Sequence, residues 1–456
     1  MMMLTPGSQT VRGFYHLVCA AGLGLVLASG CANERVVRGV QNLHQTPYDA
    51  YVDALRTAHL DGTALGRTWI DAGSEAVSAP LAIESPYQEV GFLDPREVTA
   101  RAYQIHLYQG QRLDVQIALQ ASDSAIVFVD LFEVPEDSSA GLRHVAIADS
   151  TNRLIVEARE DLSYVLRLQP ELLRGGRYTV DITVDASLGF PVAGRGRSAV
   201  QSLFGADRDG GRRSHEGVDI FAPRGTPVVA ISPGYVARID ETTIGGKVIW
   251  VRDAMRNQAY YYAHLDRQLV EPNTRVEAGD TLGTVGNTGN AISTPSHLHF
   301  GIYTTRRAVD PLPYINPMQN APLTLAADTS RLGEWARVTA SLAFLRAAPQ
   351  PRADKRYELP RNTALRLLAG SGDWYRVALP DGEEGFILAH QIETASEPIR
   401  SLEIAEGLPI RRAATSTSYP IDSVRVASQL PVFGEFGGYL GVTAPSGRTG
   451  WIEFTE

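Results

Sequence analysis

Three short segments in the middle of the chain hold residue types that can bind a metal ion. His215 and Asp219 lie four positions apart in the segment HEGVD, and His297 and His299 flank Leu298 in the segment HLH. Side chains at positions i and i+2 of a strand point to the same face, so both rings of the second segment can reach one centre. Either pair alone is more often an ordinary polar feature than a ligand set.

Together, these residues meet the requirement of a catalytic zinc ion, which takes three nitrogen or oxygen ligands and keeps a fourth position open for water. His215, Asp219 and His299 supply two imidazoles and one carboxylate. This assignment leaves His264 and His297 as bases beside the metal. An imidazole there can accept a proton, stabilise an oxyanion or protonate a leaving amine. The residues therefore predict one Zn²⁺ ion and metal-assisted hydrolysis.

His264 ends the strand-like run YYYAH, in which alternation places it on the same face as Tyr260 and Tyr262. The sequence contains no HExxH segment, so the base is not the glutamate of that class of metalloprotease. We expect Glu216 to point away from the centre. We also expect Gly217 to allow a tight turn between the first two ligands.

The stretch from about Phe190 to Ile315 resembles the lysostaphin/LytM-type zinc endopeptidases. The segments that carry the resemblance are HEGVDIFAPRGTPVVA, GYVARI, YYAHL, GTVGNTGNA and HLHFGIY. The resemblance implies that His215, Asp219 and His299 bind zinc and that His264 and His297 are catalytic. It also implies an open antiparallel sheet with zinc at the floor of a groove, and peptide cross-links of bacterial peptidoglycan as the substrate.

Two other functions stay open. Some LytM-type proteins have lost their zinc ligands and activate cell-wall amidases; all five polar residues are present here, so such a regulator would need another defect. A zinc enzyme of the D,D-carboxypeptidase kind shares the HxH ending. The three-residue gap between His215 and Asp219, together with the isolated His264, favours the endopeptidase.

The N-terminal segment has the composition of an export signal. Arg12 ends a short polar region, and the apolar run from Leu17 to Ala28 is too short to span a membrane comfortably. The run leads into LASGC, which resembles the lipobox of bacterial lipoproteins and implies lipidation of Cys31; an ordinary secretory signal is the alternative. Because Ala32 replaces the aspartate that retains lipoproteins at an inner membrane, we expect the periplasmic face of the outer membrane.

The composition excludes other classes of protein. The 456 residues carry a net charge of −9 without a long basic run, which argues against a nucleic-acid binder. Beyond the N-terminus no run approaches the roughly 18 apolar residues of a spanning helix. The only cysteine besides Cys31 is Cys19, which lies in the apolar run, so we expect no internal disulfide.

Periodicity locates the remaining elements. Thr46 and Pro47 read as the start of a helical region that Gly62 and Gly66 interrupt and that ends near Ala79. Alternating apolar residues then predict strands of a β-sandwich, at 103–107, 113–119, 126–132, 164–168 and 178–184.

The C-terminal third contains an internal repeat. WYRVALPDG followed by GFI recurs as YLGVTAPSG followed by GWI, and FLRAAP recurs as IRRAAT. Each unit resembles a bacterial SH3-like barrel, a domain that often binds cell-wall peptides; packing on the enzyme is the alternative role.

We therefore expect a mainly β, multidomain chain. Its predicted parts are a lipoprotein signal peptide (1–31), a tether and helical segment (32–99), a β-sandwich accessory domain (100–188), a zinc endopeptidase domain (189–318), and SH3-like domains 1 (331–396) and 2 (398–456, diverged). The expected partners are peptidoglycan and a membrane reached through the lipid at Cys31, with no nucleic acid.

Overall fold

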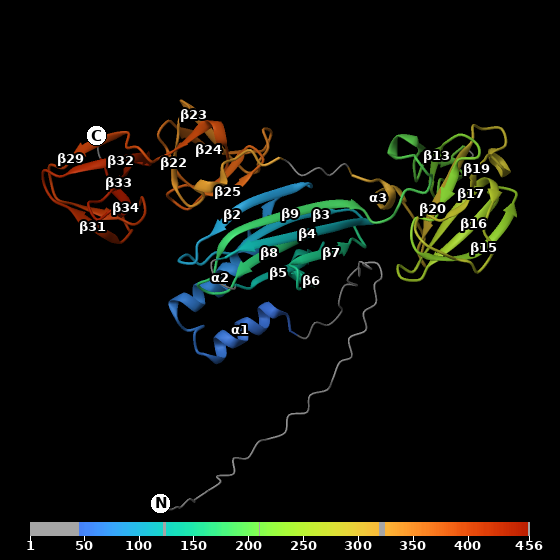
Figure 1. Cartoon of the computed structure of the whole chain (residues 1–456), viewed down its shortest axis with the longest axis horizontal. Helices are drawn as coiled ribbons and strands as arrows, with labels where there is room; N and C mark the ends of the chain where they lie inside the picture. The colour runs from blue at the N-terminus through green and yellow to red at the C-terminus, as the bar shows by residue number, and fades with distance from the viewer. Residues whose placement is uncertain (1–44, 122–124, 209, 319–323, 455–456) are drawn as a thin grey trace, which may run out of the picture. The chain divides into compact units, whose positions relative to one another are not determined.

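The computed structural model describes residues 45–121, 125–208, 210–318 and 324–454, which are mostly β-strands with few helices (Figure 1). The predicted signal peptide and Cys31 lie outside these residues. Within the described part of the chain, no helix is long and apolar enough to cross a membrane. The 3₁₀ turns are η1 (Ser138–Ala140), η2 (Arg197–Ala199), η3 (Gly289–Ala291), η4 (Thr329–Arg331) and η5 (Ala389–Gln391).

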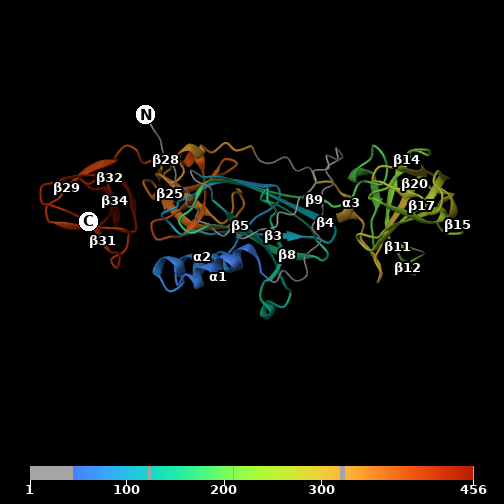
Figure 2. The same cartoon turned by 60° about the horizontal axis from the view of Figure 1, so that its bottom comes forward.

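Two helices begin the described chain, α1 (Pro47–Thr57) and α2 (Ala64–Ser78), and they lie side by side (Figure 2). The predicted start is confirmed: the Thr46 side chain accepts a hydrogen bond from the Asp49 amide, and the Asp49 carboxylate accepts one from the Thr46 amide. The predicted interruption is only half right, because Gly66 lies inside α2. A Cβ at Gly66 would collide with the Leu60 carbonyl, so this glycine serves a close approach.

The next strands form a β-sandwich, whose two sheets share one apolar core. One sheet has the order β1 (Leu81–Ala82), β3 (Arg101–Leu107), β8 (Leu162–Pro170), β5 (Val127–Val134) and β6 (Arg143–Ile147). The strands of the facing sheet are β2 (Tyr87–Leu93), β9 (Gly176–Ala186), β4 (Gln111–Gln120) and β7 (Arg153–Glu157).

The sequence prediction missed four of these strands. β1 and β2 fall in the range 32–99, which was predicted as tether and helical segment, and β6 and β7 were not predicted at all. In β2 the alternation is broken by Glu89, which is fully buried. The hydroxyl groups of Tyr87, Tyr103 and Tyr178 all donate hydrogen bonds to this carboxylate. These hydrogen bonds stabilise a buried carboxylate, which from its polarity alone would be expected at the protein surface.

The central domain is built on one antiparallel sheet. Along its main path the strands are β10 (Val200–Ser202), β13 (Val218–Phe221), β20 (His297–Tyr303), β17 (Gln258–Gln268), β16 (Gly246–Asp253), β15 (Gly234–Thr242) and β18 (Arg275–Val276). Beside this path lie β14 (Pro227–Val229), β19 (Thr281–Val285), β21 (Ala308–Val309), the hairpin β11 (Asp207–Arg208) and β12 (Arg213–Ser214), and helix α3 (Leu312–Ile315).

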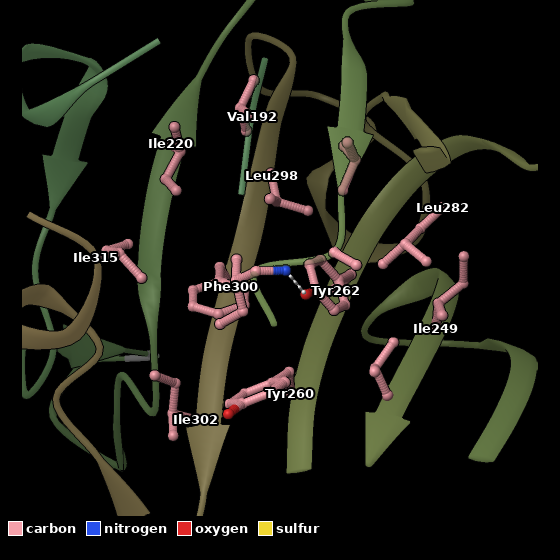
Figure 3. Packing of buried hydrophobic residues seen from close by; sticks show 14 of the residues in the cluster. Val192, Ile220, Ile249, Tyr260, Tyr262, Leu282, Leu298, Phe300, Ile302 and Ile315 are labelled. Carbon is pink, nitrogen blue, oxygen red and sulfur yellow. Dashed lines mark hydrogen bonds between the residues drawn. The ribbon is translucent and has the colours of Figure 1, made fainter. Parts of the chain in front are cut away.

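Strand β20 has one apolar face and one polar face. Leu298, Phe300 and Ile302 are fully buried on one side, where they pack with Tyr260 and Tyr262 of β17 (Figure 3). Burying each such side chain contributes about 1.5–3 kcal/mol. Since side chains alternate along a strand, the histidines between these residues must point to the opposite face. The predicted common face of the HLH pair is thereby confirmed.

Two SH3-like domains follow. The first comprises β22 (Trp335–Val338), β23 (Leu342–Arg346), β24 (Lys355–Pro360), β25 (Ala364–Ser371), β26 (Trp374–Ala378), β27 (Glu384–Leu388) and β28 (Ile392–Thr394). The second comprises β29 (Arg400–Glu403), β30 (Leu408–Arg411), β31 (Pro420–Val424), β32 (Gln429–Phe436), β33 (Tyr439–Thr443) and β34 (Thr449–Glu453).

Four strand pairings of the first domain recur in the second. β25–β26, β26–β27, β23–β27 and β23–β24 recur as β32–β33, β33–β34, β30–β34 and β30–β31. In each turn between the repeated strands a glycine has positive φ, at Gly382 and Gly447. The predicted internal repeat is confirmed.

Candidate active site

Three potential metal ligands meet on the polar face of the central sheet. His215 Nε2 lies 3.1 Å from Asp219 Oδ1 and 2.9 Å from His299 Nδ1, and the last two atoms are 3.0 Å apart. Asp219 on β13 and His299 on β20 are directly paired across the two strands, so the ladder itself sets their spacing. His215 stands just before β13.

The donor set fits a zinc ion. Ligands about 2.0–2.1 Å from a tetrahedral ion lie roughly 3.3 Å from one another, close to the spacing found here. His215 Nδ1 donates to the Leu203 carbonyl oxygen at 2.8 Å, which leaves Nε2 with its lone pair. Asp219 keeps Oδ1 for the centre, while its Oδ2 accepts from Arg208 at 2.8 Å. Two imidazoles and one carboxylate leave a fourth position open for water.

Burial and charge set the ionisation of this cluster. Burial raises the pKa of Asp219, but the adjacent imidazoles of His215 and His299 outweigh this effect and hold that pKa well below its usual range. Burial lowers the pKa of His299, against the opposing effect of Asp219. The cluster thus offers an ionised carboxylate beside an imidazole that favours its neutral form, which are the protonation states that bind zinc.

The two remaining histidines lie beside this cluster. The His264 ring centroid is 5.0 Å from that of His297 and 6.0 Å from that of His299. Each ring donates Nδ1–H to a backbone carbonyl at 2.9 Å, that of Thr288 for His264 and that of Pro295 for His297. Both rings therefore keep the Nε2 lone pair. Burial, reinforced by His297, lowers the pKa of His264 to about 4, so this ring is neutral at pH 7.

The face predicted for His264 is wrong, because β17 contains a bulge. Lys247 on β16 pairs with Leu265 on β17, and Ile249 pairs with Tyr262. Between these two pairs β17 has one residue more than β16. His264 has a φ of +61°, a left-handed conformation that non-glycine residues seldom adopt. Tyr262 stays in the core, while His264 turns to the metal face. Strand alternation could not reveal the extra residue.

Two expectations around His215 concern its neighbours Glu216 and Gly217. Glu216 is not part of the ligand group, and its carboxylate accepts a hydrogen bond from Tyr303 at 3.3 Å. The chain bends at Gly217, as expected, although the φ of this glycine is not positive. A Cβ there would collide with the Phe300 carbonyl oxygen and approach His299 Cε1 to 2.8 Å. The glycine therefore also lets the backbone pass directly beside a ligand ring.

Sequence reasoning missed Arg208. It lies on β11 and binds both the Ser202 hydroxyl, at 2.7 Å, and the Asp219 carboxylate. Its position in the sequence does not indicate a contact with Asp219, because the residues of the β11–β12 hairpin show no periodic pattern.

Sequence reasoning also missed the aromatic side chains that share this face, Trp250, Tyr261 and Tyr303. Here a signal existed. Tyr261 lies between two core tyrosines, so alternation alone assigns it to the metal face.

Comparison with known proteins assigns two segments of the chain. Residues 213–311 match the model of "Peptidase family M23", and residues 340–393 match that of "Bacterial SH3 domain". The first segment contains His215, Asp219, His264, His297 and His299.

Curated relatives cover the same region. The L-Ala--D-Glu endopeptidase of Bacillus subtilis (strain 168) is 36% identical over 138 residues, 28% of this chain and 42% of the relative. The peptidoglycan DD-endopeptidase ShyC of Vibrio cholerae serotype O1 is 35% identical over 103 residues, 22% and 23% of the two chains. The lipoprotein YgeR of Escherichia coli (strain K12) is 36% identical over 115 residues, 25% and 43%.

The chain thus spans less than half the length of each of these relatives. The matched part carries the predicted ligands, and the second matched segment coincides with the first of the two SH3-like domains. The chain therefore contains a peptidase family M23 domain followed by a bacterial SH3 domain.

Proposed function

We propose that this protein is a zinc-dependent endopeptidase that hydrolyses peptide cross-links of bacterial peptidoglycan. The observation that carries the proposal is the cluster of His215, Asp219 and His299, whose donor atoms lie about 3 Å from one another beside two imidazoles with free lone pairs. The names of two relatives in this region support it, since both are endopeptidases and one is named for peptidoglycan.

The proposed roles follow from the geometry. His215, Asp219 and His299 would hold the zinc ion, which would act as a Lewis acid and would make a water molecule nucleophilic at neutral pH. His264 is neutral at pH 7, so it can accept a proton from water and pass it to the leaving amine. His297 stands beside it and can hydrogen-bond the oxyanion that develops on the peptide carbonyl. Arg208 fixes the Asp219 carboxylate.

Digestion of purified sacculi tests the proposal. The protein should release soluble muropeptides, a chelator should stop the release, and added Zn²⁺ should restore it. Mass analysis of the products should show hydrolysed amide bonds with intact glycan. Asp219→Ala is the matched control, because it removes one ligand and should abolish both zinc binding and cleavage. Zinc-free protein that cleaves nothing yet stimulates an amidase would instead identify a regulator.

The same proposal includes the cell envelope as location. A lipid on Cys31 would hold the protein at the outer membrane, and one relative in the peptidase region is named as a lipoprotein. The SH3-like domains would bind cell-wall peptides. Cys31→Ser should move the full-length protein from the membrane fraction to the soluble fraction of the periplasm. Unchanged membrane association of that variant would contradict the anchor.

A further inference from the structure

An aromatic surface adjoins the metal cluster on the open face of the central sheet. Trp250 on β16 pairs with Tyr261 on β17, and Tyr261 pairs with Gly301 on β20. Tyr303, two residues beyond Gly301, points to the same face. We refer to Trp250, Tyr261 and Tyr303 as the aromatic shelf.

The shelf is continuous with the ligand cluster. The Tyr261 ring centroid lies 5.8 Å from that of His299, 4.5 Å from that of Trp250 and 6.3 Å from that of Tyr303. The Trp250 and Tyr303 centroids are 5.2 Å apart. All three rings are half-buried, so part of each remains open to solvent. A substrate whose scissile bond lies at the metal must extend over these rings or away from them.

Two glycines leave room for the two tyrosine rings of the shelf. A Cβ at Gly245 would collide with the Tyr261 hydroxyl, so only glycine leaves this ring its position. Gly301 occupies the site between His299 and Tyr303 on the metal face. A Cβ there would approach Tyr303 Cε2 to 2.9 Å and the Glu216 carbonyl oxygen to 3.0 Å, so glycine leaves room for the Tyr303 ring.

Charged groups surround the shelf. The Arg238 guanidinium lies 5.6 Å from the Trp250 ring centroid and is paired with Asp240. At the other end, Glu216 is exposed and accepts a hydrogen bond from Tyr303. Flat apolar rings bordered by planar charged groups suit a ligand that has an apolar face and many hydroxyl groups on its edge.

We propose that the aromatic shelf binds a sugar ring of the glycan strand, next to the stem peptide that is being cut. The inference rests on the proposed function and adds a subsite to it. A pyranose ring presents a face of C–H groups that packs on an aromatic ring, whose face carries partial negative charge. Its hydroxyl groups can then reach Arg238, Asp240 and Glu216.

The stem peptide suits the shelf less well. Peptidoglycan stem peptides consist mainly of small and charged residues, which offer no flat apolar surface for three clustered rings. The sugar is the large rigid unit of this polymer. A sugar subsite beside the metal also places the scissile peptide bond close to the glycan strand.

Two soluble substrates test this subsite. One is a cross-linked muropeptide dimer that retains its disaccharides, and the other is the same dimer after an amidase has removed them. With full-length protein, kcat/KM should be roughly tenfold higher for the first substrate, in KM more than in kcat, as expected for aromatic stacking. In Trp250→Leu and Tyr303→Leu, which keep an apolar side chain but lose the ring, the ratio should fall towards one.

The ratio is independent of how much of each variant folds, because both substrates meet the same active protein. Tyr108→Ala removes an exposed tyrosine of the sandwich and should leave the ratio unchanged. Equal kcat/KM values for the two substrates with the unmodified protein would overturn the sugar subsite. So would an undiminished preference in both leucine variants. If neither substrate is cleaved by zinc-loaded protein, the proposed function itself fails.

Discussion

His264 and His297 each donate the Nδ1 hydrogen to a backbone carbonyl, which fixes the tautomer of both rings. A ring held in this way cannot rotate to become a metal ligand without losing a buried hydrogen bond, at a cost of about 1–3 kcal/mol. The arrangement therefore separates two tasks. Three side chains are positioned to hold a metal ion, and two imidazoles remain available for proton transfer and charge stabilisation.

This separation predicts the behaviour of His264→Ala. The variant should keep one zinc ion per chain, because no ligand is lost, but its turnover of muropeptides should fall by roughly 10²–10⁴-fold, the usual contribution of a general acid–base group. Zinc stoichiometry and initial rates measured on the same preparation check both parts. His106→Ala, which removes an exposed histidine of the sandwich, is the control and should lose neither. Full turnover in His264→Ala would remove this ring from the mechanism.

The sequence predicted which residues meet, but not how each is held. The common face of His297 and His299 follows from strand alternation, which holds for β20 because the strand is regular. His264 was assigned to the wrong face because one extra residue in β17 reverses the alternation. Arg208 could not be predicted, since its contact with Asp219 depends on a loop whose path no local pattern encodes.

At the scale of the element, the pair β13–β20 determines the geometry of the cluster. Asp219 faces His299, and Phe221 faces His297 with its ring stacked 5.1 Å away. The close approach of the chain before β13 to β20 depends on Gly217, beside which lie the Phe300 carbonyl and the His299 ring. Backbone atoms cannot move aside as a flexible side chain can.

We therefore expect Gly217→Ala to push β13 away from β20. Overpacking of this kind costs typically about 1–3 kcal/mol, and the shift should also weaken zinc binding because it moves one ligand relative to another. Melting temperature and zinc affinity should fall together. Gly196→Ala is the matched control in the same domain, since a Cβ there meets no atom within 4 Å. Unchanged zinc affinity in Gly217→Ala would show that the strand pair tolerates the side chain.

The elements were predictable where burial follows polarity. The strands with regular apolar alternation, such as β3, β4 and β9, lie close to their predicted positions. The repeat of the SH3-like domains was visible because its turns need glycine with positive φ. β2 was missed because its buried Glu89 is stabilised by three tyrosine hydroxyl groups, two of them from other strands, which no local pattern shows.

At the scale of the whole molecule, the sandwich and the first SH3-like domain share a sheet. Val90 and Gly91 of β2 pair with Gly370 and Ala369 of β25, so the ladder of one domain continues into the other. Beside this junction, Arg101 of the sandwich donates to Glu384 of the SH3-like domain at 2.9 Å. We expect such continuity to make the two domains unfold as one cooperative unit, to whose stability the buried charges at the junction contribute.

These charges predict how the junction responds to acid. Burial raises the pKa of Glu384, but Arg101 and Arg376 outweigh it and lower the pKa from 4.5 to about 2. A carboxylate whose pKa is lower in the folded state contributes stability above its unfolded pKa, and that stability is lost as pH falls towards the folded value. The contribution of Glu384 should therefore be complete above about pH 4.5 and vanish near pH 2.

Calorimetry of the unmodified protein and Glu384→Gln across this range checks the sign. Near neutral pH the variant should melt at the lower temperature, by roughly 2–4 °C for each kcal/mol that the ion pair contributes. Below about pH 4.5 the two melting temperatures should converge, because the unmodified protein loses the charge that the variant already lacks. Glu383→Gln, at the exposed neighbouring position, should differ from the unmodified protein at no pH. A gap for Glu384→Gln that stays constant down to pH 2 would mean that packing at the junction, and not this charge, joins the two domains.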